Sequence, residues 1–308
     1  MSNKTELRFN TECVKCIINR YLNNVPNDFS PEQKLAYVQL VCKQVAEAPA
    51  HAGAPVVTQS IKNALKKNFG ISEDFTKEKH YFNQLMLSKE TYIYEQIMLS
   101  EDILKTAVQY AMTGNYIDFG SMHTVDEEYL EKSLQESAER NVEEAVLEAL
   151  KNDLLGAKRL VLLTDNCGEI VLDKLLLNVI KELYPEIQIT VMVRGGEVLN
   201  DATRKDALEV GIDMVATVVD NGTEIAGTFI DAVSKEALQI LENADVILSK
   251  GQANFETLRG CGKNIYYIFL CKCDMFAKRF GVEKYTGMLL NDKDYIKLSG
   301  GKENESKH

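Results

Sequence analysis

The chain has 308 residues, of which 45% are hydrophobic and 26% are charged, as is usual for a globular protein. This length predicts about two domains and a core large enough to need no disulfide bonds. The 46 acidic and 35 basic residues give a net charge of −11. This charge argues against nucleic acids and anionic membranes as partners, because both bind basic surfaces.

The N-terminal residues lack the apolar core of a signal peptide, and no apolar run reaches the roughly 18 residues of a membrane span. We therefore expect a cytoplasmic protein. Its seven cysteines should then be thiols. Four of them form two local pairs, Cys13-x-x-Cys16 and Cys271-x-Cys273, which could together bind one zinc ion. The spacing of the second pair is one residue shorter than in a zinc knuckle. Buried or helix-packed thiols are the favoured interpretation.

The first half of the chain is typical of helices. Ser30, Pro31 and Glu32 form a helix start, and Gly70 follows a helical pattern as a stop signal. No strand-like alternation of any length occurs before residue 155. The expected helices span residues 13–23, 31–45, 56–68, 75–87 and 93–112, with one or two more over 126–155.

After Gly156, short apolar runs alternate with helical stretches. The runs span residues 160–164, 188–193, 214–219, 244–248 and 264–270. The helical stretches span residues 170–183, 202–210 and 234–242, with a shorter one from Asn254. This alternation predicts βαβ units and a mainly parallel sheet covered on both faces. We expect a helical domain over residues 1–155, an α/β domain over 156–299 and a disordered tail over 300–308.

Polar residues follow four of the expected strands. The first strand ends at Asp165 and Asn166, and the second at Arg194, with Asn200 and Asp201 close behind. The third and fourth are followed by Asp220-Asn221-Gly222 and by Lys250-Gly251. In an open parallel sheet, ligands bind beyond the carboxyl ends of the strands, so these loops are expected to converge on one site.

The residue types at these loops suit a metal-assisted phosphate site. Asp165, Asn166 and Asp201 supply the oxygen atoms that Mg²⁺ or Mn²⁺ prefers. Lys250 can approach a phosphate as a point charge, and the backbone N–H groups of Gly195-Gly196 and Asn221-Gly222 can face an anion. The attacking group stays open between a water molecule and Asp165 as a nucleophile. Each loop taken alone is also ordinary turn or helix-cap chemistry, and a lone lysine is usually a solvated surface residue.

Three of these segments resemble one protein family. The motifs Asp-Asn-x-Gly-Glu-Ile-Val-x-Asp (165–173), Arg-Gly-x-x-x-x-Asn-Asp-Ala-Thr (194–203) and Lys-Gly-Gln-x-Asn (250–254) are similar to those of the damage-control phosphatases, long catalogued as a domain of unknown function, DUF89. The N-terminal Cys13 and Cys16 resemble its prokaryotic subfamily with a Cys-x-x-Cys motif. The segment 114–120 also looks like a family motif, so the resemblance covers most of the chain.

The resemblance implies a helical domain that caps a three-layer α/β/α sandwich, with a divalent metal (Mg²⁺, Mn²⁺, Co²⁺ or Ni²⁺) at the sheet edge. The implied metal ligands and catalytic residues are Asp165, Asn166 and Asp201. The implied substrate and phosphate contacts are Glu169, Lys250, Asp220, Asn200, Asn115 and Asp118, although the last two could simply cap helices. Two departures from the family pattern are Cys167 in the first motif and Cys271-Lys272-Cys273 in place of a lysine-rich segment.

Together these features predict a metal-dependent phosphatase of small phosphorylated metabolites, such as sugar phosphates, phosphopantetheine-like compounds or damaged metabolites. One alternative is a non-catalytic metal- or ligand-binding protein. Another is a methyltransferase on a doubly wound sheet, but that would need a glycine-rich loop after the first strand, and only Gly168 is present there. The physiological substrate, the preferred metal and the oligomeric state are not predicted.

Overall fold

The structure is a computed structural model that describes residues 8–118 and 126–295. The chain forms two compact units, one within residues 3–74 and one from Phe75 onward. This division differs from the expected boundary at residue 155, because the helices between residues 76 and 156 bury their apolar sides with the sheet and belong to the larger unit. The expected tail over 300–308 lies outside the described residues. None of the described helices is both long and apolar enough to cross a membrane.

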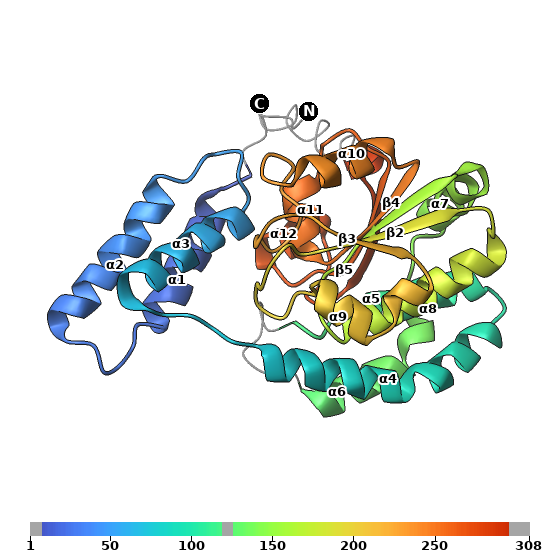
Figure 1. The fold of residues 1–308 in the computed structure, drawn as a ribbon, viewed down its shortest axis with the longest axis horizontal. Coiled ribbons are helices and arrows are strands. Elements are labelled where there is room, and N and C mark those ends of the chain that lie inside the picture. Colours follow the sequence, from blue (N-terminus) through green and yellow to red (C-terminus); the bar gives the residue numbers. More distant parts are fainter. Residues whose placement is uncertain (1–7, 119–125, 296–308) are drawn as a thin grey trace. The chain divides into compact units, whose positions relative to one another are not determined.

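The smaller unit contains three helices, α1 (Thr11–Asn23), α2 (Pro31–Ala46) and α3 (Ala54–Phe69) (Figure 1). The side chain of Asn10 accepts hydrogen bonds at the start of α1, and Ser30 forms a capping box with Gln33 at the start of α2. Each helix contributes buried side chains, such as Ile17, Val41 and Ile61, to a shared apolar core. The helical character expected for this segment is confirmed.

The larger unit is built on a six-stranded sheet with the order β3-β2-β1-β4-β5-β6. Its strands are β1 (Arg159–Leu163), β2 (Gln188–Val193), β3 (Thr217–Asp220), β4 (Val246–Lys250), β5 (Ile265–Leu270) and β6 (Gly287–Asn291). The first five strands are parallel, and β6 pairs antiparallel with β5. The expected α/β fold with a mainly parallel sheet is thus confirmed, and β6 is an additional strand.

Helices cover both faces of this sheet (Figure 1). One face carries α4 (Thr76–Met98), α5 (Ile103–Gly114), α6 (Glu127–Gln135), η1 (Ser137–Glu139), α7 (Glu144–Gly156), α8 (Glu169–Leu183), α9 (Arg204–Glu209) and η2 (Ile212–Met214). The other face carries α10 (Lys235–Asn243), α11 (Gln252–Leu258) and α12 (Asp274–Phe280). Successive side chains of β1 alternate between the two faces of the sheet. Leu160 and Leu162 pack in the core on the first face, and Val161 and Leu163 pack in the core on the second. This arrangement is a three-layer sandwich.

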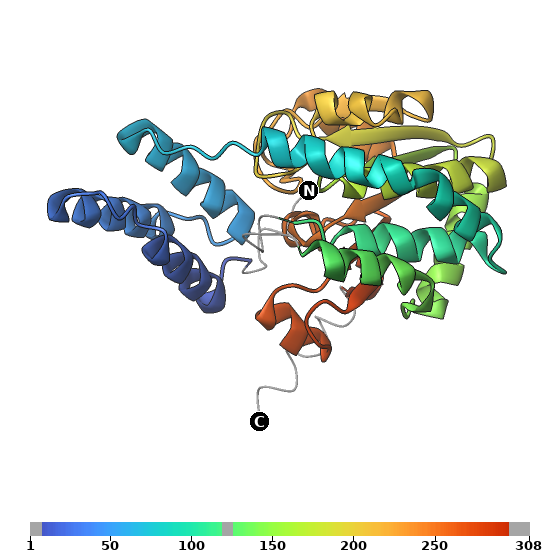
Figure 2. The same cartoon turned by 90° about the horizontal axis from the view of Figure 1, so that it is seen from below.

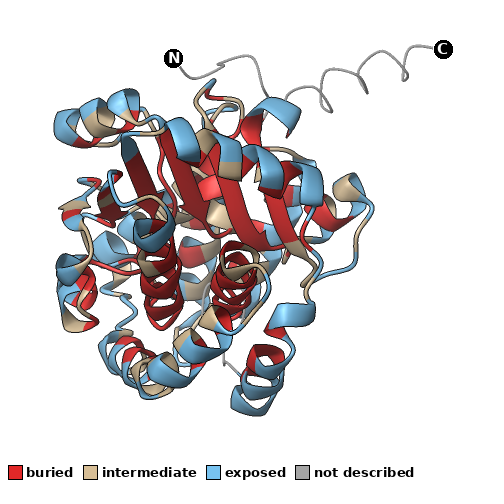
Figure 3. Ribbon diagram, turned by 90° about the vertical axis from the view of Figure 1, so that its right-hand side faces the viewer, coloured by how far each residue is buried: buried red, intermediate tan, exposed pale blue. Residues whose placement is uncertain are grey.

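Two helices on the first face, α5 and α8, are buried over most of their length, as are the strands that they cover (Figure 3). Helix α4 packs against the outer side of both helices and runs beside α5 (Figure 2). The chain passes from β1 outward through β2 to β3, then returns to β4 on the other side of β1. The strand order therefore reverses between β1 and β4, which is where open α/β sheets bind their ligands.

Candidate active site

Two segments at the carboxyl ends of β1 and β2 are joined by backbone hydrogen bonds. Asn166 and Asp201 face each other in an isolated antiparallel bridge. The Ala202 N–H donates to the Asp165 carbonyl at 2.8 Å, and the Cys167 N–H donates to the Asn200 carbonyl at 2.8 Å. The three residues expected to hold a metal thus come from segments that are fixed side by side.

The carboxylates of Asp165 and Asp201 are both buried and share one arginine. The Arg194 Nε donates to Oδ2 of Asp201 at 2.6 Å, and its Nη2 donates to Oδ1 of Asp165 at 3.3 Å. The Arg194 side chain is fully buried, and its Nη1 has no hydrogen-bond partner among the described residues. Arg194 therefore provides the positive charge that holds the two carboxylates together.

Burial raises the pKa of Asp165 well above its usual range, and repulsion from the carboxylates of Asp201 and Glu169 adds to this shift. Burial likewise raises the pKa of Asp201, although the guanidinium of Arg194 opposes that shift. Both shifts arise mainly from burial, which the single guanidinium of Arg194 does not offset. Additional positive charge at this position would stabilise the ionised carboxylates.

Two asparagines hold the other oxygen of Asp165. Its Oδ2 accepts hydrogen bonds from Nδ2 of Asn115 at 3.0 Å and from Nδ2 of Asn166 at 2.9 Å. Asn115 follows the last turn of α5, and its Oδ1 accepts from the Leu270 N–H at the end of β5. The Nδ2 atom of Asn166 also donates to Glu169 at 2.8 Å. Oδ1 of Asn166 accepts no hydrogen bond from the described residues and remains a potential ligand atom.

Lys250 does not occupy the position expected of a phosphate ligand. It is fully buried, and its Nζ donates to Glu169 at 2.7 Å, to Asp173 at 2.6 Å and to the Ala111 carbonyl at 2.8 Å. These three bonds use all the N–H groups of the ammonium. Glu169 is likewise fully buried and bonded to Lys250, Asn115 and Asn166. Both residues therefore support the site from inside the protein.

Three other expected features also differ from the predicted arrangement. Asp220 is exposed, and its Oδ1 accepts from the Gly222 N–H in a local turn. The Gly195 N–H donates to the Thr223 carbonyl, so this group and that of Gly222 are already satisfied within the loops. Asn200 is buried and donates to the Ile117 carbonyl at 3.1 Å, so it joins the site to the segment after α5.

A second lysine lies at the carboxyl edge of the sheet. Lys272 follows β5, and its Nζ lies 2.6 Å from Oδ2 of Asp118. The side chain of Asp118 is 18% exposed, and its charge contributes to the raised pKa of both Asp165 and Asp201. The sequence had identified Lys272 only as part of a departure from the family motif. Its position directly after a strand was the signal that could have identified it.

None of the seven cysteines, all of which lie within the described residues, forms a disulfide bond. Cys271 is buried, and burial raises the pKa of its thiol to about 11, which disfavours the thiolate that zinc binds. Within residues 8–118 and 126–295, no three His, Cys, Asp or Glu side chains lie together as a metal-binding group. The set around Asp165 contains two carboxylates, Asp165 and Asp201, and its third member is the carboxamide of Asn166.

The family model of the damage-control phosphatase ARMT1-like domain matches residues 9–288. The chain belongs to this family. The match extends from the first residues of the smaller unit to β6, so both compact units are part of the damage-control phosphatase ARMT1-like domain.

Individual relatives agree with this membership. A damage-control phosphatase from Archaeoglobus fulgidus is 33% identical over 220 residues, which cover 69% of this chain and 74% of the relative. An uncharacterised protein from Methanocaldococcus jannaschii is 28% identical over 295 residues, which cover 92% of this chain and 95% of the relative. The crystal structure of a DUF89 family protein from Pyrococcus horikoshii superposes with a TM-score of 0.75 over 92% of this chain and 98% of that chain. Its sequence is 24% identical, so this likeness supports the fold.

Proposed function

We propose that this protein is a divalent-metal-dependent phosphatase that hydrolyses phosphate monoesters of small metabolites. The observation that carries this proposal is the pair of buried carboxylates, Asp165 and Asp201, beside Asn166 at the point where the strand order reverses. Family membership supports the reaction class, since two relatives, from Archaeoglobus fulgidus and Pyrococcus horikoshii, are named damage-control phosphatases.

The residues at this position fit a hard divalent cation. Asp165, Asn166 and Asp201 offer carboxylate and carboxamide oxygens, which are the ligands that Mg²⁺ and Mn²⁺ prefer, and which Co²⁺ and Ni²⁺ also accept. Burial, together with neighbouring acidic groups, raises the pKa values of both carboxylates, and a bound cation would favour their ionised forms. When bound, a divalent cation would polarise the phosphoryl oxygens and make water more acidic.

In the proposed reaction, water attacks phosphorus, the bond from phosphorus to the ester oxygen breaks, and a proton passes to the departing alcohol. Asp165 would serve as a fixed metal ligand in this scheme. Its Oδ2 accepts from Asn115 and Asn166, and its Oδ1 accepts from Arg194. A carboxylate with donors on both oxygens is held in place and is a weaker nucleophile. These contacts favour water over Asp165 as the attacking group.

We assign the phosphate contact to Lys272 in place of Lys250. Among the described residues, the ammonium of Lys272 has one partner, Asp118, whereas all three N–H groups of Lys250 are used inside the protein. A phosphoryl group at the sheet edge could therefore share the ammonium of Lys272 with Asp118. The buried Nη1 of Arg194 is a further cationic donor at this edge.

The proposed substrates are sugar phosphates, phosphopantetheine-like compounds and damaged phosphorylated metabolites. The names of the two damage-control relatives support this class. A net charge of −11 is compatible with it, because a divalent cation and a few basic side chains can reverse the local potential where a small anion binds.

The proposal is tested by measuring phosphate release from p-nitrophenyl phosphate and from a panel of sugar phosphates, with Mg²⁺, Mn²⁺, Co²⁺ or Ni²⁺. We expect release that requires a metal and that falls at least about 100-fold in Asp201→Asn, more than the loss of an outer metal contact causes. Asp220→Asn is the matched control, since Asp220 follows the next strand but is exposed. Metal binding without any release would favour the non-catalytic alternative.

A trapping experiment distinguishes the two attacking groups. If Asp165 attacked phosphorus, rapid acid quenching during turnover would leave a base-labile acyl phosphate on the peptide that contains this residue. We expect no labelled peptide after turnover of a ³²P-labelled substrate. Recovery of label on Asp165 would refute water as the attacking group and leave the reaction class unchanged.

A further inference from the structure

Helix α4 contacts both of the segments that carry the proposed metal ligands. Two of its side chains, Lys79 and Asn83, lie one helical turn apart on the buried face. Their exposed fractions are 2% and 0%. Neither residue belongs to a motif at the sheet edge, and the proposed reaction does not use them.

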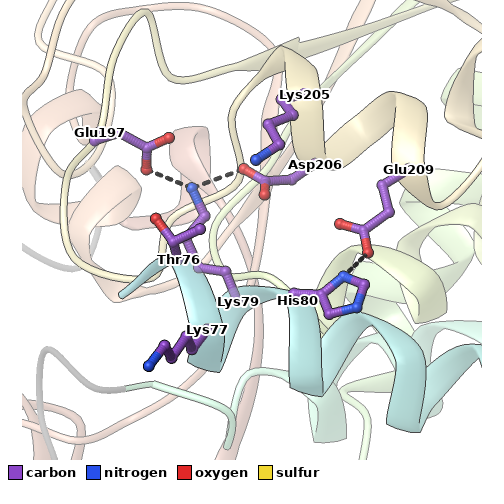
Figure 4. Close-up of a pocket in the computed structure, with 8 residues that line it drawn as sticks. All are labelled: Thr76, Lys77, Lys79, His80, Glu197, Lys205, Asp206 and Glu209. Carbon is purple, nitrogen blue, oxygen red and sulfur yellow. Dashed lines mark hydrogen bonds and ion pairs between the residues drawn. The ribbon is translucent and has the colours of Figure 1, made fainter. Parts of the chain in front are cut away.

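Lys79 binds the segment that carries Asp201. Its Nζ lies 2.7 Å from Oδ2 of Asp206 and 2.6 Å from Oε2 of Glu197 (Figure 4). Glu197 precedes Asp201 in the connection from β2 to α9, and Asp206 follows it in the first turn of α9. The same oxygen of Asp206 accepts from the N–H and the hydroxyl of Thr203, at 2.8 and 2.6 Å. Lys79 thus forms ion pairs with this connection on both sides of Asp201.

Asn83 binds the segment that carries Asp165 and Asn166. Its Oδ1 accepts from the Gly168 N–H at 2.7 Å, and its Nδ2 donates to Glu209 of α9 at 3.1 Å. Gly168 has a φ of +79°, and a Cβ there would lie 3.0 Å from Cβ of Phe82 on α4. The turn that places Asn166 before α8 is therefore held closely against α4.

We propose that Lys79 and Asn83 are positioning residues that fix the distance between the two metal-binding segments. Their hydrogen bonds and ion pairs go to neighbours of the proposed ligands and not to the ligands themselves. Each ligand is instead held by a neighbour: Gly168 lies two residues after Asn166, and Asp206 anchors the helix start that follows Asp201. Because the hydrogen bonds and ion pairs to both segments come from side chains of one helix, a shift of one segment relative to the other would break contacts with α4. This inference rests on the proposed metal site.

The first test measures Mn²⁺ affinity by calorimetric titration of the full chain and of three variants, Lys79→Met, Lys79→Arg and Asn83→Ala. We expect affinity to fall about 10- to 100-fold in Lys79→Met and Asn83→Ala, the loss typical of an outer-shell partner. Lys79→Arg should recover part of it, because arginine can bridge the same two carboxylates. At saturating Mn²⁺, the loss of kcat in these variants should be smaller than their loss of Mn²⁺ affinity.

Gln84→Ala is the matched control. Gln84 is the next residue on α4 after Asn83, and its Nε2 donates to Glu209 at 2.9 Å without contacting either ligand segment. This variant should bind Mn²⁺ as the unmodified protein does. Equal losses in Gln84→Ala and Asn83→Ala would overturn the proposal, because they would mean that any weakening of the contact between α4 and α9 has the same effect.

A second measurement separates this inference from the proposed function. Hydrogen exchange of the metal-free protein should be faster in Asn83→Ala at the amides of 166–170, and in Lys79→Met at those of 198–206. If the unmodified protein binds none of Mg²⁺, Mn²⁺, Co²⁺ and Ni²⁺, the proposed function fails, and exchange alone decides whether α4 holds the two segments. Unchanged exchange in both variants would overturn the inference, whatever the metal affinity. Asn83→Ala also keeps the test valid if Lys79→Met does not fold.

Discussion

At the scale of single residues, the site depends on buried charges that neutralise one another. Lys250 has no exposed surface and lies between Glu169 and Asp173, and Arg194 lies in the same way between Asp165 and Asp201. A buried ion is stable only when partners replace the water that it has lost. Each of these cations therefore holds a pair of acids that would otherwise repel each other.

Replacing Lys250 by methionine should destabilise the protein by about 3–5 kcal/mol, because it leaves buried carboxylates without their cation. Burial already raises the pKa of Asp173 to about 7, with Lys250 opposing the shift, so loss of Lys250 removes the main stabilisation of its ionised form. Urea unfolding measures this change. Lys15→Met is the control, since Lys15 pairs with Glu12 on the surface of α1, and we expect no measurable change there.

The same variant distinguishes a structural lysine from a phosphate ligand. If Lys250 contacts the substrate, Lys250→Met should raise KM while stability stays close to that of the unmodified protein. That outcome would contradict the role assigned here. By contrast, Lys272→Met should raise KM with a smaller loss of stability than Lys250→Met, because Lys272 pairs with one carboxylate among the described residues, Asp118, which is partly exposed.

At the scale of elements, two connections approach each other at the point where the strand order reverses. Gly251 joins β4 to α11 and has a φ of +80° and a ψ of 154°, a conformation that only glycine readily adopts. A Cβ at this position would lie 2.0 Å from Oδ2 of Asp165. The turn after β4 therefore passes directly against the carboxylate that follows β1.

Gly251→Ala should reduce Mn²⁺ affinity as well as stability, because the added methyl group would displace the carboxylate of Asp165. The backbone strain alone costs about 1–3 kcal/mol. Gly262→Ala is the matched control, since Gly262 has a φ of +79° and no atom within 4 Å of an added Cβ. It should lose stability while binding Mn²⁺ normally. Thermal melts with and without Mn²⁺ compare the two variants, and equal losses of Mn²⁺ affinity would refute the proposed displacement.

At the scale of the whole molecule, the chain carries a net charge of −11 and gathers some of its acidic groups in the core of the larger unit. The pKa values of Asp165 and Asp201 are raised above their unfolded values near 4. At these two carboxyl groups the folded, metal-free protein therefore binds more protons than the unfolded chain above about pH 4. Their contribution to the free energy of unfolding should fall as pH rises through that range.

A divalent cation should reverse this loss. Because it binds the ionised carboxylates, the stabilisation that it gives should increase with pH over the same range. At 100 times its dissociation constant, Mn²⁺ should add about 2.7 kcal/mol, or roughly 5–10 °C in melting temperature. Chelation should remove this gain, and Asp201→Asn should show none of it. A thermal shift by Mn²⁺ that is larger at pH 5 than at pH 7.5 would contradict the assignment of these carboxylates as ligands.

Several elements could be predicted from the sequence because their signals are local. The run 188–193 coincides with β2, since a mostly apolar segment rich in β-branched residues suits a buried parallel strand. Helix α4 was expected to stop at residue 87 but continues to Met98. The reason is Glu90, which interrupts the apolar pattern and pairs with Lys174 of α8 at 2.7 Å. Strand β6 was missed because its pairing with β5 decides its conformation.

Local sequence patterns predicted the parallel strands and the order of polar loops at their carboxyl ends, because apolar periodicity and turn residues act over a few neighbours. The resemblance to the family came from three motifs in those loops. Only the tertiary structure decided which polar groups meet. Lys250 and Glu169 are 81 residues apart in the chain, and Lys79 and Glu197 are 118 apart. Whether a lysine points to solvent, to a substrate or into the core depends on such distant partners, since burial of a charge requires them. Packing thus assigned Lys250 to the interior and Lys272 to the edge of the sheet.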